Sequence, residues 1–584
     1  MHYFFIYFYE NIYIIEIVNN FIVRFMEVLI LKYSYKELKM MHEKISPFEF
    51  KDKLIDLAKY SAEKNNRNIL DAGRGNPNWT AATPREAFFT FGQFAVNETR
   101  LTWNLGDLAG MPKKEGITKR FYKFVEENKN MPGTSLLKDI IDYGINELNF
   151  NSDEFIYELT DAIIGDNYPF PDRMLPHIEK IVHDYLVKEM KYDVKSGGKL
   201  NIFAVEGATA AMCYIFDSLM ANELLRKGDK IAIMTPIFTP YLEIPHLPRY
   251  NFEVVYINAD EVDENGIHTW QYSEKELEKL KDTSISTLFL VNPNNPASIA
   301  MDESTFNNII NVVENHNKDL MIISDDVYGT FVPEFTSLMS KLPYNTLGVY
   351  SYSKYFGVTG WRLGTMALHE NNVFDKRINE LDAKLKESVN KRYKDMRIDP
   401  NTISFMDRIV ADSRLVALNH TAGLSTPQQV QMAFFSAFAL IDTNNAYKSL
   451  NMDICNSRKK LLFKGLGLEL EENKYDAAYY YQFDIENWAR IFYGEELVNY
   501  LNSNYELLDV LYKLANNYSI VLLSGDGFAG PIWSVRVSLA NLESESYYKI
   551  GQAIKEILTS YVEEWKEKST EKVTVILGSI DRFV

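Results

Sequence analysis

The chain carries the run Ser351-Tyr352-Ser353-Lys354 and, eight residues after the lysine, Arg362 within Gly360-Trp361-Arg362-Leu363-Gly364. A lysine that forms a Schiff base must be partly desolvated, so that its amine loses a proton near neutral pH. An arginine and two serine hydroxyls are the residue types that hold a phosphate dianion. These residues predict attachment of pyridoxal phosphate at Lys354. Taken alone, they fit a surface lysine and an arginine on a glycine turn equally well.

A second segment suits the same phosphate. The apolar run from Ile202 to Val205 is followed by Gly207-Ala208-Thr209-Ala210-Ala211-Met212 and then by a helical pattern from Met212 to Leu225. Backbone amides at a helix N-terminus face an anion, and small side chains let it approach closely. Such turns are common, so this segment supports a phosphate site only in combination with the other segments.

Two further apolar runs end in polar residues. Leu288 to Val291 leads into Asn292-Pro293-Asn294-Asn295-Pro296, and Leu320 to Ser324 leads into Asp325-Asp326-Val327-Tyr328. An aspartate here could pair with a protonated pyridine nitrogen, which makes the ring an electron sink. Asn295 and Tyr328 could reach the phenolic oxygen of the same ring.

The fifth segment places a lone arginine in an apolar strand. Ser524-Gly525-Asp526-Gly527-Phe528-Ala529-Gly530 leads into the strand pattern Trp533 to Leu539, which contains Arg536. A buried cation is costly unless it is paired. The carboxylate of a substrate is the expected partner.

In order, spacing and residue type, these five segments resemble the fold-type I aminotransferase family. The resemblance implies an α/β fold: a mainly parallel seven-stranded sheet in a large domain, a smaller α/β domain, and helical insertions. The alternation of strand and helix patterns from Lys188 to about Leu368 predicts the same parallel sheet, with the cofactor at the carboxyl ends of the strands.

The resemblance also implies roles for individual residues. Lys354, Asp325 and Tyr328 would be catalytic, with Asp325 on the pyridine nitrogen. The other implied cofactor ligands are Asn295 on the ring oxygen, Phe238 on the ring face, Ala208, Thr209, Ser351, Ser353 and Arg362 at the phosphate, and Tyr168 from the partner subunit. Arg536 would bind the α-carboxylate of the substrate.

Within this family the chain most resembles the aspartate 4-decarboxylases, over about residues 45 to 565. The likeness rests on Asp71-Ala72-Gly73-Arg74-Gly75-Asn76-Pro77-Asn78-Trp79, on a long helical insert, and on Asp166-Asn167-Tyr168-Pro169-Phe170-Pro171. The chain is also much longer than an ordinary aminotransferase. The implied activity is the pyridoxal phosphate-dependent conversion of L-aspartate into L-alanine and CO2, with side aminotransferase activity that would use 2-oxo acids.

The chain departs from the aminotransferase pattern in two places. The usual Asn-Pro-Thr-Gly turn is Asn295-Pro296-Ala297-Ser298, and the stretch 418–427, where aspartate aminotransferases carry an arginine for the distal carboxylate, has none. A salt bridge to the β-carboxylate would oppose its loss, because CO2 leaves neutral. Our candidates for that side are Arg74 with Gly75, His420 and Tyr168. Arg74 could instead form a loop salt bridge, and His420 could be a satisfied loop histidine.

Two other functions remain open. A plain aminotransferase acting on aspartate or aromatic amino acids is the nearer alternative, and the missing arginine counts against it. A non-enzymatic regulator built on this fold would need an amino-terminal helix-turn-helix module. No basic DNA-reading helix is found between Met1 and Lys53.

Composition sets further limits. The 584 residues are 46% hydrophobic and carry a net charge of −18, which argues against binding to nucleic acid or to an anionic membrane. Two cysteines, Cys213 and Cys455, are too few for a disulfide framework and suit a reducing cytoplasm. The nine histidines form no metal-ligand motif. The family resemblance implies a homodimer with shared active sites and a larger assembly of such dimers.

We expect six segments. They are a non-native or disordered extension (1–40, alternatively an amphipathic interaction segment), an amino-terminal arm and part of the small domain (41–84), a helical insertion (85–160), the cofactor-binding large domain (161–372), a second helical insertion and interface segment (373–428), and a carboxyl-terminal small domain (429–584).

Overall fold

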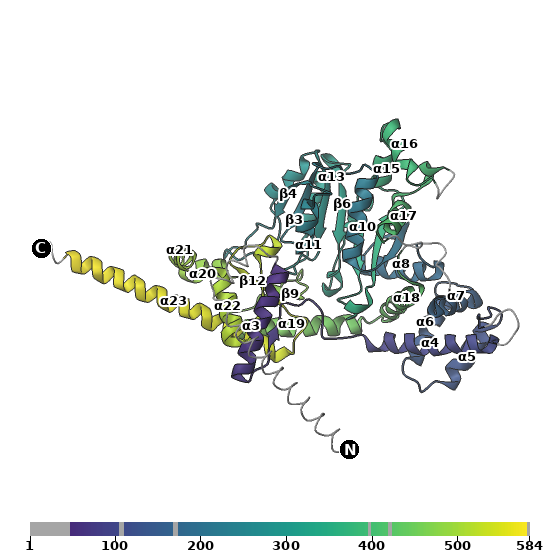
Figure 1. Cartoon of the computed structure of the whole chain (residues 1–584), viewed down its shortest axis with the longest axis horizontal. Coiled ribbons are helices and arrows are strands. Elements are labelled where there is room, and N and C mark those ends of the chain that lie inside the picture. Colours follow the sequence, from purple (N-terminus) through teal and green to yellow (C-terminus); the bar gives the residue numbers. More distant parts are fainter. Residues whose placement is uncertain (1–46, 104–109, 167–172, 395–398, 418–422, 581–584) are drawn as a thin grey trace, which may run out of the picture.

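A computed structural model describes residues 47–103, 110–166, 173–394, 399–417 and 423–580 (Figure 1). The predictions for residues 1–40, Tyr168 and His420 lie outside these ranges. No helix in the described part of the chain combines the length and apolar content needed to cross a bilayer.

A seven-stranded sheet forms the centre of the large domain, in the order β2-β8-β7-β6-β5-β3-β4. All neighbouring strands are parallel except those paired with β8, which runs antiparallel to both β2 and β7. The strands are β2 (Leu200–Val205), β3 (Lys230–Thr235), β4 (Glu253–Asn258), β5 (Ile285–Val291), β6 (Met321–Asp325), β7 (Thr346–Ser351) and β8 (Gly364–His369). The central strands are apolar and buried along their whole length, as expected for a sheet covered on both faces. This confirms the predicted α/β fold.

Helices connect and cover these strands. They are α8 (Pro176–Met190), α9 (Val194–Gly197), α10 (Ala208–Ala221), α11 (Thr239–Glu243), α12 (Glu274–Leu277), α13 (Glu303–Asn315) and α14 (Leu338–Lys341). The longest of the connections between strands, α10 and α13, bury Phe216 and Ile309 against the sheet. Parallel strands need such crossovers, so the strand ends that precede them lie at one edge.

The first insertion is a helical layer beside the sheet (Figure 1). It contains α4 (Ala82–Thr102), α5 (Ile117–Glu127), α6 (Thr134–Asn146) and α7 (Ser152–Ile164). Helix α18 (Thr426–Ile441) packs against this layer and α8. The boundary expected between residues 428 and 429, at the start of the carboxyl-terminal small domain, stays a prediction. Helix α18 spans that boundary and contacts the first insertion.

The second insertion is tied to the large domain by a buried polar cluster. The second insertion contains α15 (Val373–Asn379), α16 (Ala383–Lys391) and α17 (Phe405–Ala417). The buried Asp412 carboxylate accepts hydrogen bonds from Ser218 (2.8 Å), Tyr393 (2.8 Å) and Arg392 (2.7 Å). Ser218 belongs to α10, so this cluster joins the insertion to the helix whose N-terminus faces the predicted phosphate.

The small domain has its own apolar core. A three-stranded antiparallel sheet has the order β11 (Leu523–Ser524), β12 (Ser534–Ser538), β9 (Tyr480–Asp484), and the short β1 (Leu70–Asp71) pairs with β10 (Ile520–Val521). Its helices are α3 (Pro47–Asn65), α19 (Ala446–Leu466), α20 (Ile485–Tyr493), α21 (Glu495–Asn504), α22 (Leu507–Tyr518) and α23 (Ser544–Ile580). The amino-terminal arm thus enters the small domain, and α23 extends away from it (Figure 1).

Candidate active site

The structure brings the predicted site residues together at the carboxyl ends of the central strands. Asp325 ends β6, Lys354 follows the end of β7, and Asn295 lies on the turn after β5. The small domain adds Arg536 from β12, whose guanidinium donates to the Asn295 side chain over 3.2 Å. Segments separated by more than two hundred residues therefore line one site between the two domains.

Lys354 is half-buried and points at the amino-terminal arm. Its amine donates a hydrogen bond to the carbonyl oxygen of Gly75 over 2.9 Å. The hydroxyl of Tyr479 donates to the same carbonyl over 2.8 Å. Gly75 has no room for a side chain, because a Cβ there would lie 2.2 Å from the Tyr480 oxygen and 3.3 Å from the Lys354 amine. The arm therefore brings its backbone directly to the predicted Schiff-base lysine.

Asp325 is a buried carboxylate without a cationic partner among the described residues. It accepts hydrogen bonds from the Tyr241 hydroxyl (2.5 Å) and from the backbone N–H of Val327 (3.1 Å). Burial raises the pKa of the Asp325 carboxyl to about 6, although the two hydrogen bonds and the charge of Lys354 oppose that rise. A protonated pyridine nitrogen would supply the missing positive charge.

The predicted phosphate cradle is also assembled. Val205 of β2 pairs with Gly364 of β8, so the turn before α10 lies beside the glycine-rich turn around Arg362. A Cβ on Gly207 would lie 2.6 Å from the Arg362 guanidinium, and the φ of Gly207 is +91°. Arg362 donates to the carbonyl of Thr359 over 3.0 Å. A glycine at 207 thus leaves space between the arginine and the helix N-terminus.

The remaining predicted phosphate ligands lie around this turn. Ala208 begins α10, and Thr209 follows it with an exposed side chain. Ser351 and Ser353 are buried, and the Ser353 backbone N–H donates to the Ser351 hydroxyl over 3.3 Å.

Arg536 is 2% exposed and has no carboxylate partner in the described structure. It donates to the carbonyl of Gly73 over 2.7 Å as well as to Asn295, and its Nε finds no acceptor among the residues that the structure describes. Its guanidinium lies 4.3 Å from the centre of the Tyr480 ring and 4.8 Å from that of Phe528. Burial lowers the pKa of this guanidinium. A buried cation left in this state is suited to receive the carboxylate of a ligand.

Tyr328 and Phe238, which are predicted to contact the cofactor ring, lie near this site and contact other side chains. The Tyr328 hydroxyl donates to the Tyr480 oxygen over 3.1 Å. Phe238 precedes α11 and is partly buried, with its ring 6.0 Å from that of Tyr241.

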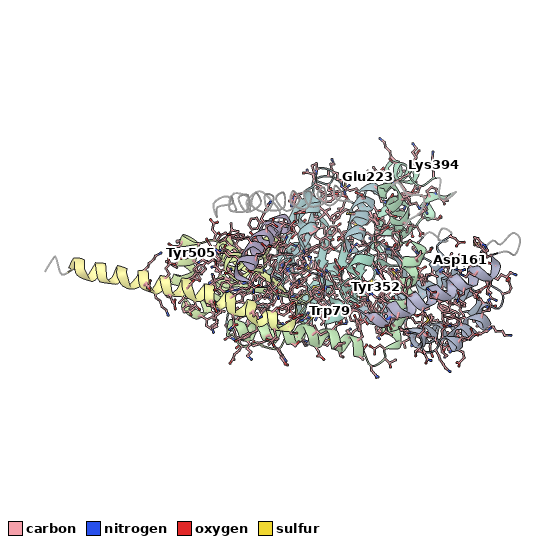
Figure 2. The ribbon with its side chains drawn as sticks, turned by 60° about the horizontal axis from the view of Figure 1, so that its bottom comes forward. Trp79, Asp161, Glu223, Tyr352, Lys394 and Tyr505 are labelled. Atoms are coloured by element: carbon pink, nitrogen blue, oxygen red, sulfur yellow. The ribbon has the colours of Figure 1, made fainter. Side chains whose placement is uncertain are left out.

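Arg74 is largely exposed and pairs with the Asp71 carboxylate over 3.0 Å. This is the loop salt bridge that the sequence left open, and a role for Arg74 toward the β-carboxylate stays a prediction. Trp79, labelled near the middle of the molecule in Figure 2, donates to the carbonyl of Tyr355 over 3.2 Å. That bond fixes the end of the arm segment against the large domain.

Sequence reasoning missed three tyrosines that contact the site: Tyr241, Tyr479 and Tyr480. Tyr241 lies in a segment already singled out for Phe238, only three residues further on. Tyr479 and Tyr480 lie in an aromatic run at the start of β9, which resembles ordinary core packing. The signal available was the alternation of Tyr480 and Gln482 with Tyr481 and Phe483, which places one polar set on a single face of the strand.

The side chains present fit pyridoxal phosphate. Among the described residues, the site holds a buried carboxylate that forms no ion pair, a half-buried lysine, a buried guanidinium that forms no ion pair, and a glycine turn facing Arg362. These groups match the pyridine nitrogen, the aldehyde, the substrate carboxylate and the phosphate, respectively.

A family model described as aminotransferase class I and II matches residues 201–554. The chain belongs to this family of fold-type I, pyridoxal phosphate-dependent enzymes. Over 529 residues it is 44% identical to the bifunctional aspartate aminotransferase and L-aspartate beta-decarboxylase of a Pseudomonas species, and the match covers 90% of this chain and 98% of that protein.

Solved structures show the same fold at low identity. A single mutant of the Thermus thermophilus aspartate aminotransferase matches with a TM-score of 0.54 and 14% identity, over 89% of this chain and 98% of its own. The aromatic aminotransferase of Pyrococcus horikoshii matches with a TM-score of 0.51 and 18% identity, over 87% of this chain and 99% of its own.

Proposed function

We propose that this protein removes the β-carboxylate of L-aspartate to give L-alanine and CO2, and that it also transaminates aspartate. The observation that carries the proposal is the relative from Pseudomonas, which has both activities in its name and is similar over nearly its whole length. The site geometry supports it, because Lys354, Asp325 and Arg536 lie together where such a substrate and cofactor would bind.

Pyridoxal phosphate would supply a pyridinium ring that accepts the electrons released at the substrate's Cα, and an imine that accepts those released at Cβ. Asp325 would hold the proton on the pyridine nitrogen, and Arg362 with the α10 N-terminus would hold the phosphate. Lys354 would carry the cofactor and then, once its amine is free, move the proton at Cα. Arg536 would orient the substrate through its α-carboxylate, so that the reacting bonds stand in the right geometry.

The β-carboxylate should be held without a strong salt bridge. In the described structure, Arg74 is occupied by Asp71 and largely exposed, so it can move toward a ligand at little cost. We propose Arg74, the backbone at Gly75, His420 and Tyr168 for this side of the substrate. Substituting Arg74 would then change the ratio of alanine to oxaloacetate more than it changes cofactor binding.

We propose that the protein acts in the cytoplasm as a homodimer with shared active sites, and that these dimers assemble further. The family resemblance supports the dimer, and the predicted reach of Tyr168 into the partner's site follows from it. The two cysteines, both free in the structure, are compatible with a reducing compartment.

The deciding experiment incubates the cofactor-loaded protein with L-aspartate and no keto acid, and follows CO2 and alanine together. We expect equal amounts of CO2 and alanine over many turnovers. Bleaching of the cofactor's absorbance with release of oxaloacetate, and no sustained CO2, would identify a plain aminotransferase instead.

A further inference from the structure

Tyr480 is a buried phenol inside the site for which the proposed function gives no role. Its ring lies against the Arg536 guanidinium. Its oxygen lies against Gly75, next to the point that the Lys354 amine also approaches. The hydroxyl therefore borders the space between the group that would hold the α-carboxylate and the group that would act at Cα.

Strand geometry explains this orientation. Tyr480, Gln482 and Arg536 share one face of the small antiparallel sheet, because Gln482 pairs directly with Arg536 in the register of β9 and β12. Tyr481 and Phe483 alternate with them and pack with the apolar core of the small domain. The sheet thus separates two adjacent tyrosines, one facing the site and one facing the core.

The Tyr480 hydroxyl accepts a hydrogen bond, and its own proton is available for donation. Its oxygen accepts the hydroxyl proton of Tyr328 over 3.1 Å. Among the described residues, no acceptor is found for the proton of Tyr480 itself. Tyr479 differs, because its hydroxyl donates to the Gly75 carbonyl.

The charges around this phenol favour its ionisation. The cations Lys354 and Arg536 face it, together with the titratable phenols of Tyr328 and Tyr479. Burial raises the pKa of Tyr480, but the positive charges of Lys354 and Arg536 and the hydrogen bond from Tyr328 together outweigh it, so the pKa is lowered overall. The pKa of Tyr328 moves the other way, well above its usual value, mainly because of burial. A phenol with a lowered pKa is the stronger acid of the two near neutral pH.

Decarboxylation at Cβ requires an acid, because Cβ must receive a proton after CO2 has left. A substrate with its α-carboxylate on Arg536 and its Cα at the Lys354 amine has Cβ one bond away, beside the space that Tyr480 borders. We infer that Tyr480 donates the proton that Cβ receives after CO2 has left. This inference rests on the proposed function.

The step is balanced without a further reactant. The bond between Cβ and the carboxylate carbon breaks, CO2 leaves neutral, and the electron pair is delocalised over the substrate, with Cβ as its nucleophilic end. The O–H bond of Tyr480 then breaks, its proton forms the new C–H bond, and the phenolate regains a proton from water. Transamination needs no proton at Cβ, so it does not need Tyr480.

The test compares Tyr480→Phe with Tyr481→Phe, its neighbour on the opposite face of β9. In Tyr480→Phe we expect alanine formation from L-aspartate to fall by about 10²-fold or more, and the single-turnover transamination of L-aspartate to fall by less than about tenfold. The alanine-to-oxaloacetate ratio therefore drops. Tyr481→Phe should keep the wild-type ratio, because its hydroxyl is remote from the site.

A second measurement does not depend on turnover. The ultraviolet difference titration of wild type minus Tyr480→Phe, in protein without cofactor or substrate, should show one tyrosine ionising below the usual pKa of about 10. Tyr480→3-fluorotyrosine keeps the hydroxyl and lowers its pKa further. Because only the protonated phenol can donate, the alkaline limb of the decarboxylation profile should move to lower pH in this variant, which also carries the test if Tyr480→Phe does not fold.

The outcomes separate the two proposals. If the wild-type protein releases no CO2 from L-aspartate, the proposed function is wrong and the role of Tyr480 falls with it. If the wild type releases CO2 but Tyr480→Phe keeps the wild-type product ratio, the proposed function stands and the inference on Tyr480 is overturned, with Lys354 as the remaining donor.

Discussion

At the scale of single residues, the site is defined by charges that the described chain leaves without a partner of opposite sign. Asp325 and Arg536 are both buried, and neither forms an ion pair among the described residues. Burying an unpaired charge reduces the free energy of unfolding. Such residues are expected where a ligand supplies the missing charge.

Arg536→Gln should separate binding from stability. We expect kcat/KM for L-aspartate to fall by about 10²-fold or more, because the α-carboxylate loses its cation. The melting temperature of the cofactor-loaded protein without substrate should equal or exceed that of the wild type, since a buried charge has been removed. A lower melting temperature with unchanged kinetics would instead make Arg536 a structural residue.

Asp325→Asn should change stability in a pH-dependent way. The folded-state pKa of Asp325 is raised to about 6, so its carboxyl disfavours folding increasingly as pH rises from about 4 through 6. In cofactor-free protein we expect the variant to be more stable than the wild type above about pH 7, by roughly 3 kcal/mol. The difference should vanish below about pH 4, as measured by urea unfolding.

Asp326 provides the comparison for that experiment. The Asp326 side chain is also buried, and burial raises its pKa to about 7. Its carboxylate accepts hydrogen bonds from the hydroxyls of Ser337 and Ser324. Asp326 is present in both proteins, so its titration cancels apart from the rise in its pKa that the Asp325 charge causes. A stability difference that is independent of pH would show that the Asp325 carboxyl does not ionise as described.

At the scale of elements, the phosphate cradle depends on how α10 follows β2. Gly207→Ala should weaken cofactor binding, because the new Cβ would meet the Arg362 guanidinium at 2.6 Å. We expect the dissociation constant for pyridoxal phosphate to rise by about tenfold or more, which corresponds to about 1.4 kcal/mol. Absorbance titration of the cofactor-free protein measures it.

The matched control is Gly228→Ala. Gly228 also has a positive φ, of +85°, but no atom of the described residues lies within 4 Å of a Cβ placed there. It should lose stability of the order of 1 kcal/mol through backbone strain and keep the affinity for the cofactor. Equal loss of affinity in both variants would attribute the effect to strain rather than to Arg362.

The predicted elements differ in how well the sequence identified them. Helix α10 and the buried strands β2, β5 and β6 follow from hydrophobic patterns within short windows. The site-facing role of β9 was harder to recognise, because within its run of tyrosines only the alternating Gln482 marks a polar face. Only its pairing with β12 shows which tyrosine faces Arg536.

At the scale of the whole molecule, the amino-terminal arm connects the two domains through the site. The carbonyls of Gly73 and Gly75 accept hydrogen bonds from Arg536 and Lys354, respectively. Cations from the small and the large domain are therefore both held by one short backbone segment. A bound substrate and cofactor would compete with these carbonyls for the same two side chains.

The proposed dimer predicts complementation between two inactive variants. Mixing Lys354→Ala with Tyr168→Phe after unfolding and refolding should restore activity, because a hybrid has one site with both wild-type residues. Random pairing should recover up to about one quarter of the wild-type sites. Sedimentation should give at least twice the mass of one chain. Absence of recovery, with each variant folded, would place Tyr168 in its own subunit's site or outside any site.

The sequence by itself determined the α/β fold, the family and the positions of Lys354, Asp325, Arg362 and Arg536, because each lies in a local pattern of strand, turn and residue type. Only the tertiary structure decided how these groups meet: Gly75 against Lys354, Tyr241 on Asp325, and Tyr480 beside Arg536. The reason is physical. Local patterns specify elements, whereas contacts between residues hundreds of positions apart depend on strand register and on how the arm crosses between the domains.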